Sequence, residues 1–123
     1  MFDIQKFLQD AKSKGDKRRL DKRLPYRQAV HFRIDKGPFQ KAQLEDVSGG
    51  GLRLTLPKYI PNGAQVQVLY NQPLTSRQYW VEGKVRWSRE VETRYATGVE
   101  IKFQSDCDES PYQDLLTQLE TAC

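Results

Sequence analysis

The stretch EDVSGGGLRLTL, residues 45–56, contains the pattern that decides the fold. In its second half, Leu52, Leu54 and Leu56 alternate with polar residues. Alternation with a period of two is typical of a β-strand that buries one face and exposes the other. The three glycines before the leucines interrupt this pattern and indicate a turn or an irregular connection. The stretch therefore predicts a strand that enters a hydrophobic core from a glycine-rich connection.

Strand patterns of the same kind recur on both sides of this stretch. They cover residues 27–35, 39–48, 64–70, 78–90 and 96–105. Turn signals such as Pro-Asn-Gly at 61–63 separate them, and no helical pattern lies between them. Six strands joined by turns indicate an all-β fold, as an antiparallel barrel or sandwich. Gly83, inside one of these strands, predicts a bulge or a close approach of two backbones.

Helical patterns are found at the two ends of the chain. Residues 3–12 form a short pattern, with apolar side chains at helical spacing. At the other end, Ser110 is expected to cap a helix, with Pro111 at its first position and Gln113 completing a capping box. The apolar stripe of this helix, expected to pack against the barrel or plug one end, consists of Tyr112, Leu115, Leu116 and Leu119.

Length and hydropathy fit one domain outside the membrane. The 123 residues divide into an N-terminal helix and arm at 1–16 and a main domain at 17–123. No apolar run approaches the roughly 20 residues needed to span a bilayer. The N-terminus lacks the apolar core of a signal peptide. We therefore expect a cytoplasmic protein.

The residues that usually carry catalysis or bind metals are few. The single histidine, His31, lies in a strand pattern with no obvious nucleophile beside it. Cys107 and Cys123 are sixteen residues apart, with no histidine or further cysteine near either, so we expect free thiols and no metal site. No paired carboxylates occur at helical or strand spacing. These observations predict a protein that is not an enzyme and has no cofactor.

Positive charge is concentrated in KRRLDKRLPYR, residues 17–27. This segment has six cationic residues and one acidic residue, which gives a local charge of +5, whereas the whole chain carries +4. The remaining residues are therefore close to neutral, and the basicity belongs to one segment. Such a segment is either a solvated arm or a clamp for an anionic ligand.

The connection at residues 46–51, DVSGGG, offers hydrogen-bonding groups beside a flexible backbone. Asp46 has two acceptor oxygens, and the hydroxyl of Ser48 both donates and accepts. The glycines permit positive φ angles and close approach of a ligand. They do not form a phosphate-binding P-loop, since no Lys-Ser/Thr pair or helix follows. An ordinary hairpin connection would also use these residue types.

The two stretches together resemble the PilZ domain family, the cytoplasmic receptors for the bacterial second messenger cyclic di-GMP. RRLDKRLP at 18–25 is similar to the family's R-x-x-x-R motif with its preceding arginine. DVSGGG at 46–51 is similar to its D/N-x-S-x-x-G motif. GKVRWSRE at 83–90 and ATGVEIKF at 96–103 look like its last two strands. The resemblance covers about residues 17–122 and implies a six-stranded antiparallel β-barrel with a C-terminal helix.

Cyclic di-GMP carries two phosphates and two guanines, and the resemblance assigns roles toward them. Arg19 and Arg23 would hold phosphate and the guanine Hoogsteen edge, because a guanidinium forks onto paired acceptors. Asp46 would accept hydrogen bonds from the guanine N1–H and N2–H₂ groups. Ser48 would add a hydrogen bond to base or phosphate. Arg18 would be a third arm, which in this family often accompanies a stacked dimer of the ligand.

Other residues are expected near the ligand or at the surface. Gly50 and Gly51 would leave the barrel wall clear for the ligand. Trp87 is expected to stack on a guanine or ribose face, or else to be a half-exposed strand residue. Arg27 and Arg53 are expected to be exposed loop and strand residues.

The resemblance implies a receptor that acts on another protein. Repulsion among the cations of residues 17–23 and the lack of apolar anchors predict an arm that is mobile without ligand. Cyclic di-GMP would hold the arm against the barrel, reposition the helix at 3–12 and signal to a partner in trans. Two alternatives stay open, namely a nucleic-acid-binding β-barrel and a PilZ-like scaffold that binds proteins without a ligand.

Overall fold

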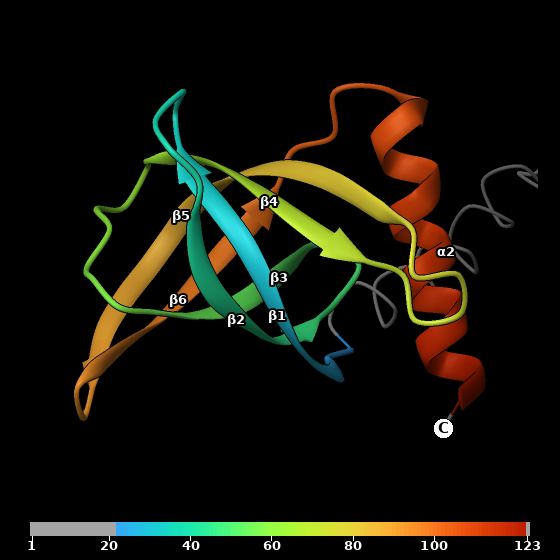
Figure 1. The fold of residues 1–123 in the computed structure, drawn as a ribbon, viewed down its shortest axis with the longest axis horizontal. Helices are drawn as coiled ribbons and strands as arrows, with labels where there is room; N and C mark the ends of the chain where they lie inside the picture. The colour runs from blue at the N-terminus through green and yellow to red at the C-terminus, as the bar shows by residue number, and fades with distance from the viewer. Residues whose placement is uncertain (1–21, 123) are drawn as a thin grey trace, which may run out of the picture.

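The computed structural model describes residues 22–122, in which six antiparallel strands close into a barrel and helix α2 covers one end (Figure 1). The strands lie around the barrel in the order β1-β2-β3-β6-β5-β4. The predicted fold class is confirmed, and it is a barrel rather than a sandwich. The expected helix at 3–12, the arm and the arginines Arg18 and Arg19 lie outside the described residues. The elements are β1 (Leu24–Ile34), β2 (Gln40–Val47), β3 (Gly51–Leu56), β4 (Gln65–Asn71), β5 (Gln78–Val91), β6 (Arg94–Ile101) and α2 (Asp106–Ala122).

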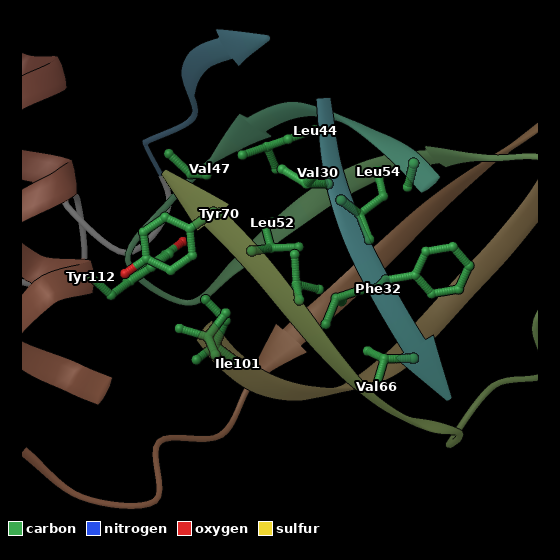
Figure 2. Packing of buried hydrophobic residues seen from close by; sticks show 14 of the residues in the cluster. Val30, Phe32, Leu44, Val47, Leu52, Leu54, Val66, Tyr70, Ile101 and Tyr112 are labelled. Atoms are coloured by element: carbon green, nitrogen blue, oxygen red, sulfur yellow. The ribbon is translucent and has the colours of Figure 1, made fainter. Parts of the chain in front are cut away.

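The core fills the interior of the barrel (Figure 2). The three leucines of β3 point inward, and each is at most 1% exposed. They meet Phe32 of β1 and Leu44 of β2, which are fully buried. Burying a side chain of this size contributes about 1.5–3 kcal/mol, so the alternation seen in the sequence fixes which face of each strand turns inward.

Helix α2 closes the end of the barrel with the predicted apolar stripe. Tyr112 is fully buried, and its ring meets the ring of Tyr70 edge to face, with centroids 6.2 Å apart. Phe103 lies after the end of β6, and its ring centroid is 5.7 Å from that of Tyr112. The rest of the stripe, also buried, consists of Leu115, Leu116 and Leu119.

The helix begins earlier than the sequence predicted, so the cap assigned to Ser110 is wrong. The carboxylate of Asp108 accepts hydrogen bonds from the backbone N–H groups of Gln104 and Ser105, both at 2.9 Å. The Ser105 hydroxyl accepts one from the backbone of Cys107 at 3.1 Å. This reciprocal arrangement is a capping box, and it places Pro111 inside the helix rather than at its start.

Gly83 marks a close approach of two strands. A Cβ atom at this position would lie 2.4 Å from the carbonyl oxygen of Glu100 on β6. The irregularity in the β5–β6 pairing falls two residues later, between Val85 and Trp87. A second one, between Leu44 and Asp46, interrupts the β2–β3 pairing. Such irregularities change the direction in which side chains point, and both irregularities lie next to the site described below.

Other sequence predictions concern residues at the surface. His31 is exposed on β1, and Cys107 is an exposed free thiol.

Within residues 22–122, no group of His, Cys, Asp and Glu side chains is placed to hold a metal ion. Neither the length nor the hydropathy of any described helix is sufficient to cross a membrane.

Candidate functional site

A pocket of about 620 Å³ lies on the outside of the barrel, beside the connection between β2 and β3. The segment before β1 and the β2–β3 connection form one side of it. The outer faces of β3, β5 and β6 form the remainder. The pocket therefore lies where the two sequence stretches converge, although 23 residues separate Arg23 from Asp46.

Arg23 is fixed in this pocket by the β2–β3 connection. Its Nε and Nη2 atoms donate to Oδ1 of Asp46 at 2.9 and 2.6 Å. Its Nη1 atom donates to the hydroxyl of Ser48 at 3.0 Å. Three of the guanidinium's five N–H groups are engaged at most, so the others remain able to donate to a ligand.

Asp46 binds a second arginine through its other oxygen. Nη2 of Arg53 lies 2.6 Å from Oδ2 of Asp46, whose side chain is only 11% exposed. The buried carboxylate thus holds two guanidinium groups side by side at the pocket rim, where each arginine is nearly half exposed. Arg53 was expected to be an exposed strand residue. It is exposed in part, but it belongs to this site.

The β2–β3 connection is held in shape by its own backbone and by helix α2. The backbone N–H of Ser48 donates to the carbonyl oxygen of Gly51 at 2.8 Å. The hydroxyl of Tyr112 donates to the carbonyl oxygens of Ser48 and Gly51, at 2.6 and 3.0 Å. Burial raises the pKa of Tyr112, so the hydroxyl stays protonated and remains a donor.

Gly51 is needed for the closure of the barrel. A Cβ atom there would lie 2.3 Å from the carbonyl oxygen of Val99 on β6. Gly51 therefore has a packing role, because a residue without a Cβ lets β3 approach β6 this closely, and its role in leaving space for a ligand stays a prediction.

Trp87 forms the far side of the pocket, on the outer face of β5. It is 39% exposed, and it pairs with Gly98 of β6. A Cβ atom on Gly98 would lie 2.3 Å from the indole Nε1, so the glycine lets the ring lie close against the sheet. The guanidinium of Arg89 lies 5.3 Å from the ring centroid. The indole is held in place while part of its surface faces the pocket.

The third side of the pocket carries another ion pair. Nε of Arg86 lies 2.9 Å from Oε1 of Glu100, and Nζ of Lys102 lies 3.7 Å from Oε2. Sequence reasoning identified neither Arg86 nor Glu100 as a site residue. Both are alternating polar residues on the outer face of a strand, which is the ordinary pattern for an exposed residue.

Six of the eight predicted site residues line this one pocket: Arg23, Asp46, Ser48, Gly50, Gly51 and Trp87. Arg18 and Arg19 lie outside the described residues. Arg27 does not line the pocket, and instead pairs with Glu45 on the outer face of the barrel. Sequence reasoning missed Arg53, Arg86, Gly98 and Glu100, all of which line it.

The arrangement suits an anionic ligand with a flat ring. Arg23, Arg53 and Arg86 supply fork-shaped donors, and Trp87 supplies an aromatic face. Asp46 pairs with Arg23 and Arg53 and so orients them, and Glu100 forms an ion pair with Arg86. The orientation matters because a guanidinium binds phosphate or a base edge most strongly in bidentate geometry.

The family model for the PilZ domain matches residues 17–120. The chain belongs to the PilZ domain family. This PilZ domain is similar in structure to the PilZ domain of CeSA from a cellulose-synthesizing bacterium, with a TM-score of 0.65 and 16% identity over 81% of this chain and 99% of the other. No curated protein is significantly similar in sequence.

Two longer proteins have a similar fold. The Bacillus subtilis inhibitor of motility MotI/DgrA has a TM-score of 0.67 and 17% identity over 81% of this chain and 48% of its own. Borreliella burgdorferi PlzA, whose structure is a complex with c-di-GMP, has a TM-score of 0.54 and 13% identity over 94% of this chain and 56% of its own. The present chain thus spans about half the length of these two proteins. At such identities the similarity establishes the fold.

Proposed function

We propose that this PilZ domain is a receptor for cyclic di-GMP and binds it in the pocket between the β2–β3 connection and Trp87. The observation that carries the proposal is the convergence of Arg23 and Arg53 on the buried carboxylate of Asp46. Two fixed guanidinium groups at one rim match a ligand that has two phosphates and two guanine Hoogsteen edges. The family assignment and the PlzA complex with c-di-GMP support the same ligand.

In this proposal the pocket residues divide the recognition between them. Arg23 and Arg53 bind phosphate oxygens or guanine O6 and N7 with the donors that Asp46 leaves free. Ser48 adds a hydrogen bond, and Trp87 covers a guanine or ribose face, a contact worth about 1–3 kcal/mol. Asp46 orients both arginines in the ligand-free protein. Its role as an acceptor for guanine N1–H and N2–H₂ stays a prediction.

Calorimetric titration with cyclic di-GMP tests the proposal and reports stoichiometry at the same time. We expect saturable binding, with one ligand per chain or two if a stacked dimer forms. Cyclic di-AMP is the control, because it has the same phosphates but lacks the O6 acceptor and the N1–H and N2–H₂ donors of guanine. Equal affinity for the two nucleotides would show that the pocket does not recognise guanine. Absence of cyclic di-GMP binding would overturn the proposal.

The output that we propose is a change in the arm that precedes β1. Arg23, the last arm residue of the motif, is anchored at the pocket in the described part of the chain. Two ligand phosphates would also attract the cations of residues 17–22 and draw the arm toward the β2–β3 connection. The altered arm would present a different surface to a partner protein in trans.

Limited trypsin digestion tests the arm proposal. The bonds after Lys17, Arg18, Arg19, Lys22 and Arg23 are cleavable, and we expect saturating cyclic di-GMP to protect them. Lys84, in the middle of β5, is the internal control, and its cleavage should change little. Equal cleavage of the arm with and without the nucleotide would show that the arm does not respond to the ligand.

A further inference from the structure

A second concave region lies on the outer face of the barrel, next to the pocket in which we propose that cyclic di-GMP binds. It has a volume of about 500 Å³ and we call it the arginine groove, after Arg27, Arg53, Arg89 and Arg94, which line it. The lining residues come from β1, β2, β3, β6 and β5, which are neighbours in the barrel in that order. The groove extends to the β5–β6 hairpin, at the end of the barrel far from α2 (Figure 1).

The groove carries an excess of positive charge. Its lining has four arginines and two carboxylates, those of Glu45 and Glu92, and Arg53 is paired in addition with Asp46. Glu45 is already engaged, because it accepts from Nε of Arg27 at 3.1 Å and from the hydroxyl of Thr55 at 2.7 Å. Within residues 22–122, no carboxylate pairs with Arg89 or Arg94. Among the described residues, two guanidinium groups at the hairpin end therefore lack a carboxylate partner, and that of Arg89 lies over the Trp87 ring.

The shape of the groove favours an extended chain over a single ion. Ala96 of β6 forms its floor, in register with Thr55 of β3 on one side and Arg89 of β5 on the other, so a small side chain lies between larger ones. Neighbouring strands are about 4.8 Å apart, so the four spacings from β1 to β5 measure roughly 19 Å along the curved wall of the closed barrel. An extended polypeptide of about six residues covers such a path, whereas a single ion contacts only one part of it.

The composition of the groove distinguishes a peptide from a nucleic acid. None of the described residues that line it is aromatic, whereas single-stranded nucleic acids are bound by stacking of bases on aromatic rings. Its fork-shaped arginines match carboxylates in bidentate geometry. We infer that the arginine groove is a docking surface for an extended acidic segment of a partner protein. This inference goes beyond nucleotide binding, and docking itself does not require the nucleotide.

Fluorescence anisotropy with a synthetic acidic peptide tests the inference. The probe is a labelled peptide of about ten residues that alternates glutamate and serine, so that an extended chain presents its carboxylates on one side. The full chain is titrated without nucleotide at about 0.05 M ionic strength, where screening is weak. We expect saturable binding that the double variant Arg27→Gln/Arg94→Gln weakens at least about tenfold, because the charge-assisted contact of Arg94 is lost and Glu45, no longer paired with Arg27, repels the acidic peptide.

The matched control is the double variant Lys36→Gln/Lys84→Gln, which removes the same charge from a different pocket. It should change peptide affinity less than about twofold, because these lysines do not line the groove and, even at this ionic strength, charges farther apart than a Debye length of about 14 Å are largely screened. Arg53 and Arg89 are left intact because they contact Asp46 and Trp87. Circular dichroism establishes that each variant is folded.

Three results would overturn the inference. The first is an absence of saturable peptide binding by the parent. The second is an equal loss of affinity in both double variants, which would indicate attraction to net charge alone. Tighter binding of an oligothymidine of similar length, lost in Arg27→Gln/Arg94→Gln, would instead identify a nucleic-acid surface. Because the assay contains no nucleotide, each of these results is independent of whether cyclic di-GMP binds in the neighbouring pocket.

Discussion

At the scale of single residues, the site is organised by one buried carboxylate. Asp46 is buried, with 11% of its side chain exposed, and binds the guanidinium groups of Arg23 and Arg53 through its two oxygens. A buried carboxylate that lost these partners would carry a substantial desolvation penalty, so the three side chains hold one another in position. Because the arginine side chains are already ordered in the ligand-free protein, binding a ligand would cost them little further conformational entropy.

Arg23→Lys should weaken cyclic di-GMP binding at least tenfold, or about 1.4 kcal/mol. Arg23 donates from three different nitrogens to Asp46 and Ser48, and a lysine ammonium cannot reproduce this fork. We expect the same of Arg19→Lys, from its place in the R-x-x-x-R motif. Calorimetry gives the affinities, with Arg27→Lys as the control outside the pocket. Parent-like binding by both motif variants would show that charge alone suffices.

Gly98→Ala should displace the indole of Trp87, because the new methyl group would lie 2.3 Å from its Nε1 atom. In a Trp80→Phe background Trp87 is the one remaining tryptophan, so its emission reports the displacement. We expect a shifted emission maximum and, from the loss of stacking, binding weaker by about 1–3 kcal/mol. Unchanged emission and affinity relative to Trp80→Phe alone would contradict this placement of the ring.

Only some residues of this site could be predicted from the sequence. Arg23, Asp46 and Ser48 could be predicted because the motif fixes their spacing. Arg53 could not, since alternation within a strand shows that a side chain points outward but not which neighbour it meets. Its partner depends on the irregular pairing between Leu44 and Asp46, and that irregularity leaves no clear signal in the sequence.

At the scale of the elements, α2 supports the site from the inside of the barrel end. Tyr112 extends from the helix to the carbonyl oxygens of Ser48 and Gly51, and so connects the helix to the motif-bearing connection. The helix itself was predictable from its apolar stripe. Its start was not, because the sequences Ser105-x-x-Asp108 and Ser110-x-x-Gln113 both fit a capping box.

Tyr112→Phe should lower the free energy of unfolding at pH 7 by about 1–3 kcal/mol, because a buried carbonyl group loses its donor. Urea denaturation measures the loss. Tyr59→Phe is the control, since Tyr59 is 56% exposed. If Tyr112→Phe were as stable as this control, the helix would not support the connection through its hydroxyl.

The same hydroxyl predicts how stability depends on pH. Burial raises the pKa of Tyr112 above its ordinary value of about 10, so the unfolded chain releases the proton first. This contribution to stability is complete below about pH 10 and is lost as the pH rises above it. Denaturation between about pH 9 and 11 should therefore show a shallower decline for Tyr112→Phe than for the parent. Identical slopes would contradict the assignment, since Tyr70, whose pKa burial also raises, is present in both.

At the scale of the whole molecule, the barrel brings two basic surfaces together on its outer wall. Arg53 lines both the pocket proposed for cyclic di-GMP and the arginine groove, so the two surfaces share a side chain. The six strands were predictable from alternation, but their order around the barrel was not, because alternation carries no information about strand partners. It is this order, with β6 between β3 and β5, that places Trp87 opposite the β2–β3 connection.

The most direct test of the account is a nuclear magnetic resonance titration of the labelled protein with cyclic di-GMP. The chain has two tryptophans, so its two indole N–H signals separate the pocket from the rest of the barrel. We predict that the Trp87 indole and the backbone amides of Ser48, Gly50 and Gly51 shift with saturation, while the Trp80 indole stays in place. Absence of shifts at saturating nucleotide, or shifts centred on Trp80, would contradict binding in this pocket.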